Sequence, residues 1–164
     1  MIPKILTNFN LYVNGRPQTG KAKTVTPPAV QLTMIEHQGG GMFGKAKIPV
    51  GHDAIEMQFT MAEYAKDVMS EAGKPVDIPV TMYGHAEDGQ GNTQAISYFC
   101  RGKLSVTPDS ATPGQDNGVS FRVDCTALRI VVDGSNTHDI DIPAGRYIVG
   151  GVDYAAQMRA NTRS

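Results

Sequence analysis

Several residue types are scarce in this sequence, and each shortage argues against a class of protein. The 164 residues include no Trp and only two cysteines, Cys100 and Cys125. A disulfide-stabilised secreted scaffold needs more cysteines than this. Both cysteines lie in apolar, strand-like runs, so we expect two buried, reduced thiols. A disulfide between them is the less favoured alternative, because pairing of the two runs would bring them close.

An excess of charge of one sign is also lacking. Lys and Arg number 15 against 16 Asp and Glu, which leaves a formal net charge of -1. No chain-wide positive field exists to neutralise phosphates, which argues against tight nucleic-acid binding. No stretch approaches the roughly 20 apolar residues of a membrane span, and residues 1–4 lack the apolar run of a signal peptide. We therefore expect a soluble protein made in the cytoplasm, with no membrane partner.

Turn-forming residues, by contrast, are abundant. The chain has 18 Gly and 10 Pro, while only 19% of its residues are charged. This composition predicts many turns and short strands in one domain over residues 1–164. Asn14-Gly15 and Asp133-Gly134 are the residue pairs that tight turns prefer, and a loop rich in Pro, Gly and Asp covers residues 107–118.

Alternation of apolar and polar residues predicts most of the strands. It occurs over residues 9–13, 30–36, 55–59, 76–83, 93–106 and 119–132. In the last stretch Phe121 and Cys125 share one parity, whereas Leu128 and Ile130 have the opposite parity. A one-residue slip of this kind near Thr126-Ala127 predicts a β-bulge, or a strand that bends between two sheets.

One helix is predicted, over residues 61–72. Thr60 and Glu63 have the spacing of a capping box, and Gly73 and Pro75 are typical of a helix end. The apolar residues recur at helical spacing and are expected to seal the core: Met61, Tyr64, Ala65, Val68, Met69 and Ala72. The predicted fold class is mainly β with one α-helix, as a small antiparallel barrel or a two-sheet sandwich with the helix packed on one side.

A glycine-rich segment between two of the predicted strands cannot form a regular element. It consists of Gly39, Gly40, Gly41, Met42, Phe43 and Gly44. With Lys45 it matches the start of a phosphate-binding loop, but Ala46 stands where Ser or Thr is needed. Pro49 and Gly51 would also interrupt the helix that such a loop must open. We interpret the segment as a mobile loop followed by a strand, with Met42 and Phe43 contacting another subunit rather than folding back locally.

Catalytic and metal-binding patterns are not found. The histidines are scattered with no metal-ligand spacing, at His37, His52, His85 and His138. Neither a nucleophile elbow nor a zinc-protease motif occurs. We therefore predict no catalytic residues, no metal, no cofactor and no enzymatic activity.

Five segments, in order and approximate spacing, resemble the major tail tube proteins of contractile phages and the tube proteins of R-type pyocins. They are MIPKILTNFNLYVNG, GGGMFG, GHDAIEMQFTM, VDCTALRIVVDG and GRYIVGGVDYAAQMR. The resemblance implies that six copies form a ring, that rings stack into a tube inside a sheath, and that the sheets of neighbouring copies join into one large ring-shaped barrel. It also implies that the 39–44 loop and the two termini reach between subunits or rings.

The same resemblance implies a role and a set of partners. The channel would conduct DNA after sheath contraction, without specific binding, and the partners would be sheath, tape-measure and baseplate or tube-initiator proteins. The protein would be part of the virion, assembled in the host bacterial cytoplasm. On this interpretation the polar residues Gln31, Thr33, Glu56 and Gln58 line a channel that is neutral to acidic, because Lys or Arg would retain phosphates.

Other functions remain open from the sequence. A type VI secretion tube protein would share the fold and polymer but pass effector proteins. A monomeric β-rich binding module would need an aromatic site, whereas this chain lacks Trp and its Tyr residues are dispersed. A degenerate nucleotide-binding protein is suggested only by Lys45 and Asp133.

Overall fold

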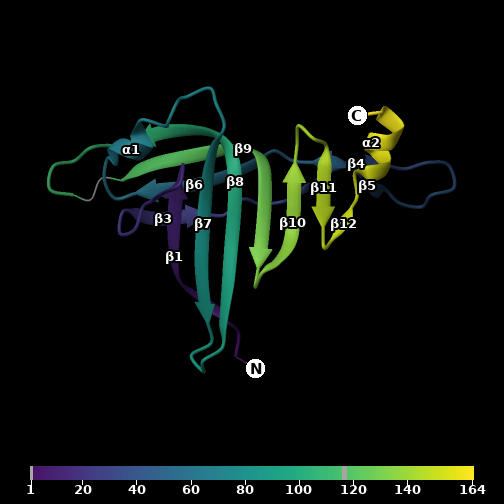
Figure 1. The fold of residues 1–164 in the computed structure, drawn as a ribbon. Coiled ribbons are helices and arrows are strands. Elements are labelled where there is room, and N and C mark those ends of the chain that lie inside the picture. Colours follow the sequence, from purple (N-terminus) through teal and green to yellow (C-terminus); the bar gives the residue numbers. More distant parts are fainter. Residues whose placement is uncertain (1, 116–117) are drawn as a thin grey trace.

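A large antiparallel sheet forms the body of the protein (Figure 1). The computed structural model describes residues 2–115 and 118–164. Eight strands lie in the order β12-β11-β10-β9-β8-β7-β1-β2, while β6 pairs with β9 and β3 pairs with β6. Their bounds are β1 Ile5–Val13, β2 Arg16–Pro17, β3 Ala22–Thr26, β6 Ile55–Met61, β7 Ile78–Glu87, β8 Thr93–Pro108, β9 Val119–Val132, β10 Ser135–Asp141, β11 Arg146–Val149 and β12 Val152–Asp153. The mainly β, antiparallel architecture is confirmed, although the sheet stays open rather than closing into a barrel.

The sheet bends where β9 changes partners. Residues 119–125 pair with β6, and residues 127–132 pair with β10. The long strand β8 follows both parts of β9, with a register shift that leaves Thr126 as the extra residue. The Thr126 hydroxyl oxygen lies 3.2 Å from the Arg101 carbonyl oxygen of β8. The bulge predicted at Thr126-Ala127 is therefore confirmed, and it folds the sheet around one core.

Gly102 lies opposite this bulge. A Cβ atom added to it would lie only 2.0 Å from the backbone oxygen of Asp124. The two backbones can approach this closely only because the side chain is absent.

The core contains buried residues from both parts of the bent sheet. Phe59 of β6 and Phe121 of β9 stack there with ring centroids 5.0 Å apart, and both are buried. Cys100 and Cys125 are buried free thiols, as predicted. Contact with the Cys125 thiol and burial raise the pKa of Cys100, so we expect it to be an unreactive thiol.

The predicted helix over 61–72 is wrong in extent. The helix α1 covers only Lys66–Met69, and no side-chain hydrogen bond caps it. Met61 instead ends β6, where it pairs with Ala22 and Val119, and the Thr60 hydroxyl contacts that of Thr24. Strand pairing on both sides of β6 has overridden the helical periodicity. Of the residues expected to seal the core, Val68 is buried, as the helical pattern predicted, whereas Tyr64 is 58% exposed and that prediction is wrong.

The tight turns follow the prediction. Asn14 and Gly15 have φ values of 52° and 77°, and Asp133 and Gly134 have 50° and 80°. The loop predicted over 107–118 connects β8 to β9, and its residues 116–117 lie outside the described part of the chain. A second short helix, α2 (Ala156–Thr162), was not predicted.

Within residues 2–115 and 118–164, no helix has the length and apolar character needed to cross a membrane.

Candidate assembly interface

A hairpin stands apart from the main sheet. Its strands β4 (Leu32–His37) and β5 (Ala46–His52) form a separate two-stranded sheet in the described chain. Figure 1 shows the hairpin running past α2, with its loop extending beyond the body on the side away from α1. An isolated two-stranded hairpin is only marginally stable in water, which makes additional packing partners favourable.

Both faces of the hairpin present apolar side chains. Ile35 pairs with Ile48, and the adjacent Met34 pairs with Pro49. Because neighbouring residues of a strand point to opposite faces, the two pairs lie on opposite sides of the hairpin. Ile35 is 51% exposed, Met34 44% and Ile48 42%. In a monomer the apolar side chains on both faces of the hairpin remain in contact with water. In an assembly, neighbouring subunits can bury both faces.

The hairpin tip carries the predicted glycine-rich segment. The Met42 amide donates to the Gly39 carbonyl at 3.2 Å, and the Gln38 side chain donates to the Met42 carbonyl at 3.3 Å. These contacts give the loop a turn while Phe43 stays fully exposed. Phe43 therefore does not fold back onto its own chain, whereas the Met42 sulfur accepts a hydrogen bond from the Gly39 amide at 3.2 Å within the loop.

The apparent phosphate-binding loop is part of this hairpin. Lys45 lies 3.6 Å from Glu36 across the hairpin, and β5 begins at the next residue. A strand thus follows the loop, in place of the helix whose amides a phosphate needs. The interpretation of a loop followed by a strand is confirmed.

Hydrogen bonds close the base of the hairpin by joining the ends of its two strands. The Asp53 amide donates to the Gln31 carbonyl at 2.8 Å, and the Thr33 hydroxyl donates to the Asp53 carboxylate. His52 at the end of β5 stacks on Tyr147 of β11, with ring centroids 5.4 Å apart. The stacked rings of His52 and Tyr147 join the hairpin to the main sheet.

The four residues predicted to line a channel occupy two different places. Glu56 and Gln58 lie on the exposed face of β6, opposite Asp124 and Arg122 of β9. Gln31 and Thr33 lie at the base of the hairpin, which belongs to the separate sheet. All four are exposed, but the structure does not bring them onto one strand face.

Two cations near Glu56 and Gln58 have acidic partners. The Arg122 Nε atom lies 3.2 Å from an Asp124 carboxylate oxygen, and the Lys103 Nζ atom lies 3.1 Å from Asp77. Asp77 also accepts a hydrogen bond from the Thr126 hydroxyl at 2.9 Å. The hydrogen bond from Lys103 and that from Thr126 lower the pKa of Asp77, which keeps it ionised beside the bulge.

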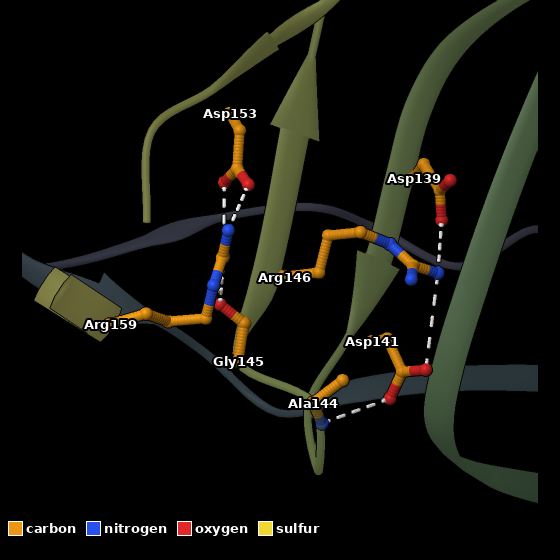
Figure 2. A network of polar contacts seen from close by, with 7 residues as sticks. All are labelled: Asp139, Asp141, Ala144, Gly145, Arg146, Asp153 and Arg159. Carbon is orange, nitrogen blue, oxygen red and sulfur yellow. Dashed lines mark hydrogen bonds and ion pairs between the residues drawn. The ribbon is translucent and has the colours of Figure 1, made fainter. Parts of the chain in front are cut away.

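A second exposed apolar surface lies around α2, on the β11–β12 side of the sheet. Val152, Tyr154 and Met158 are exposed there, together with Ile142. Figure 2 shows the polar network beneath: Arg159 of α2 binds the Asp153 carboxylate and donates to the Gly145 carbonyl at 2.8 Å. Arg146 lies 3.0 Å from Asp139 and 3.9 Å from Asp141. The contacts of Arg159 hold α2 against the β11–β12 hairpin, and those of Arg146 join β11 to β10.

Docking of α2 should be sensitive to acid. The hydrogen bond from Arg159 lowers the pKa of Asp153 below its ordinary value of 3.8. Because the folded-state pKa is depressed, the ion pair contributes fully above about pH 4 and is lost as the pH falls through the lowered value. Arg159→Ala should release α2 already at neutral pH, seen as faster amide hydrogen exchange over residues 156–162. Arg129→Ala is the control, and equal exchange in the two variants would refute this role.

The fold matches components of a contractile injection system. Two cryo-EM structures of an extracellular contractile injection system contain matching chains, one in the PVC sheath/tube terminator and one in the PVC sheath-tube complex, both in the extended state. The first chain has a TM-score of 0.58 and 11% identity, covering 80% of this chain and 97% of that one. The second has a TM-score of 0.53 and 12% identity, covering 79% and 90%. At such low identity the likeness establishes the fold alone.

The sequence comparisons show to which family of tube-like proteins the chain belongs. The model of the family "Phage tail tube protein FII" matches residues 3–162, so the chain belongs to the phage tail tube protein FII family. The tail tube protein of Escherichia phage P2 is 30% identical over 167 aligned positions, covering 98% of this chain and 97% of that protein. The major tail tube protein of Serratia phage KSP20 is 28% identical over 144 positions, covering 86% and 84%. The chain is thus a structural, non-enzymatic component of a phage tail, and the predicted resemblance is confirmed.

Proposed function

We propose that this chain builds the inner tube of a contractile phage tail as stacked rings of six copies. The observation that carries the proposal is the projecting β4–β5 hairpin with apolar side chains on both faces. Its partners would be further copies of the chain, the surrounding sheath, and tape-measure and baseplate or tube-initiator proteins. Assembly would take place in the host bacterial cytoplasm.

A projecting hairpin would bind a neighbouring copy at a surface that is not itself a hairpin, so the two sides of the contact would differ. A contact between two different surfaces is heterologous, so it closes into a ring when the rotation allows and otherwise continues as a filament. Closure around six copies would join the open sheets into one ring-shaped barrel, and repetition along the axis would stack the rings. Exposed strand edges would then find partners in neighbouring copies.

The channel is proposed to conduct DNA after sheath contraction. Glu56 and Gln58 are candidates for its lining, with Gln31 and Thr33 at the hairpin base as further candidates. The pairing of Arg122 with Asp124 and of Lys103 with Asp77 supports this assignment, because paired cations retain phosphates less strongly than free ones.

The channel lining can be tested by charge reversal. The double variant Glu56→Lys with Gln58→Lys should assemble normally, since both side chains are exposed, but should release DNA more slowly. We expect a roughly tenfold or larger slowing at low salt that weakens as salt is added. Ejection is followed with a DNA-binding dye on intact particles. The control pair Glu63→Lys with Gln157→Lys carries the same charge change, and an equal ejection rate in both variants would contradict the assignment.

The tube itself is tested by cryo-EM of the purified chain over a concentration series and of tails from intact particles. Hollow tubes with six copies per ring are the expected result. A chain that stays monomeric at all concentrations and is absent from the tube of the particles would overturn the proposal. Tubes filled with protein after contraction would favour a secretion tube instead.

A further inference from the structure

We infer that the free edge of β1 is the surface to which the β4–β5 hairpin of a second copy adds. The inference rests on the proposed function and names the two elements that meet between subunits. In this arrangement the hairpin extends the main sheet of its neighbour by main-chain hydrogen bonds, as in other cases of strand addition.

Most of β1 is paired on one side only. β7 pairs with it along its whole length, whereas β2 pairs only with Tyr12 and Val13. The Leu11 carbonyl accepts a hydrogen bond from the Gln18 amide on the β2 side, at 2.8 Å. By alternation, the backbone groups of Phe9 face the same side, where the described chain supplies no strand.

In the single copy, two Asn side chains accept hydrogen bonds from backbone amides of this edge. The Asn8 carboxamide oxygen accepts from the Phe9 amide at 2.9 Å, and the Asn10 oxygen accepts from the Leu11 amide at 2.9 Å. Local side-chain acceptors of this kind compete with strand pairing and can be replaced by the carbonyls of an added strand. The edge amides therefore have hydrogen-bond acceptors in the monomer, but the edge can still pair with an added strand.

The surroundings of the edge fit an apolar strand. Ile5 is 64% exposed, and Ile2 and Leu6 are also exposed beside it. Next to the free edge, a groove of about 440 Å³ lies between residues 8–10 and 18–20. The groove offers space for side chains of a strand laid along β1.

The hairpin is the segment that matches this edge best. Its strands have 6 and 7 residues and are unpaired on their outer sides, and the unpaired stretch of β1 covers residues 5–10. The other candidate edges in the described chain fit less well: β3 has five residues and no large exposed apolar side chain, and β12 has two residues. Because the stacking of His52 on Tyr147 ties the hairpin to the β11 side, the natural acceptor is the β1 edge of another copy.

Disulfide cross-linking of assembled tubes tests the contact. Ile35→Cys on the hairpin is combined with Ile5→Cys on β1, and the tubes are treated with a mild oxidant. Native Cys100 and Cys125 are buried and should not interfere. Since the contact is heterologous, a ladder of linked multimers is expected rather than dimers alone. The control combines Ile35→Cys with Val76→Cys, a comparably exposed apolar position that precedes β7 and lies near the other end of β1 from Ile5.

The possible outcomes distinguish the contact at the β1 edge from the proposed tube function. Tubes that form but give no ladder through Ile5→Cys, or an equal ladder through Val76→Cys, would overturn the inference and leave the tube function standing. Failure of the unmodified chain to form tubes, either alone or in particles, would overturn both.

A second variant tests the edge without cross-linking. Ile2→Lys with Ile5→Lys should raise the concentration needed for assembly by roughly tenfold or more, because charged residues on an edge disfavour strand addition. Circular dichroism should stay unchanged, since both side chains are exposed. Assembly at the concentration of the unmodified chain would count against the β1 edge.

Discussion

Replacing Gly102 with alanine should lower the free energy of unfolding by about 3 kcal/mol or more. The added Cβ would lie 2.0 Å from the Asp124 oxygen and 2.7 Å from its carbonyl carbon. Both are backbone atoms at the bulge, so no flexible side chain can move aside. Relief would require shifting β8 away from β9, and with it the bend that shapes the core. Urea unfolding followed by circular dichroism measures the loss.

Two other glycines serve as controls for Gly102→Ala. Gly40 has no heavy atom within 4 Å of an added Cβ, so Gly40→Ala should leave the unfolding free energy nearly unchanged. Gly84→Ala should lie between the two, because the nearest atom, at 2.9 Å, belongs to the Leu6 side chain and can rotate. An unfolding midpoint for Gly102→Ala equal to that of Gly40→Ala would show that the close approach at the bulge is not a constraint.

Placing two aspartates on one face of the hairpin should abolish assembly. Ile35→Asp with Ile48→Asp replaces a cross-strand apolar pair that is exposed in the monomer. Burying each isoleucine in a contact is worth roughly 1.5–3 kcal/mol, and burying two carboxylates would be unfavourable. The concentration needed for assembly should therefore rise by at least about a hundredfold. Light scattering over a concentration series gives this value.

The matched control for the hairpin is Tyr64→Asp with Val76→Asp. Both residues are more than half exposed and apolar, but they lie in the segments flanking α1. Both double variants should remain folded monomers at low concentration. If the hairpin variant assembles as readily as this control, the hairpin does not carry the contact between copies.

Local signals predicted much of the sheet. The turns at Asn14-Gly15 and Asp133-Gly134 and the parity slip at Thr126 were readable because each depends on a few adjacent residues. The helix over 61–72 was mispredicted because the pairing of Met61 with Ala22 and Val119 is a long-range effect. The helix α2 has no side-chain cap and is held by the contact of Arg159 with Asp153. No local sequence pattern therefore predicted it.

The interface was only partly readable for the same reason. The composition of residues 39–44 indicated an exposed loop, and the exposed face of Glu56 and Gln58 followed from alternation. A strand after the loop was predicted, but not its bounds, because Pro49 and Gly51 oppose a regular strand and a bulge breaks its register. That Thr33 lies on a separate sheet, with Gln31 just before it, depends on how the hairpin is attached, which the sequence pattern does not specify. The role of the loop in contacts between copies, the channel lining and the single domain over 1–164 stay predictions.

The most direct test of the tube account is negative-stain electron microscopy of the unmodified chain beside a variant lacking residues 39–44. Both proteins are imaged over the same concentration series, and circular dichroism checks that the variant remains folded. The account predicts six-fold rings or hollow tubes from the unmodified chain and only folded monomers from the variant. Tubes of equal number and diameter from both proteins would contradict the assembly role of the hairpin tip.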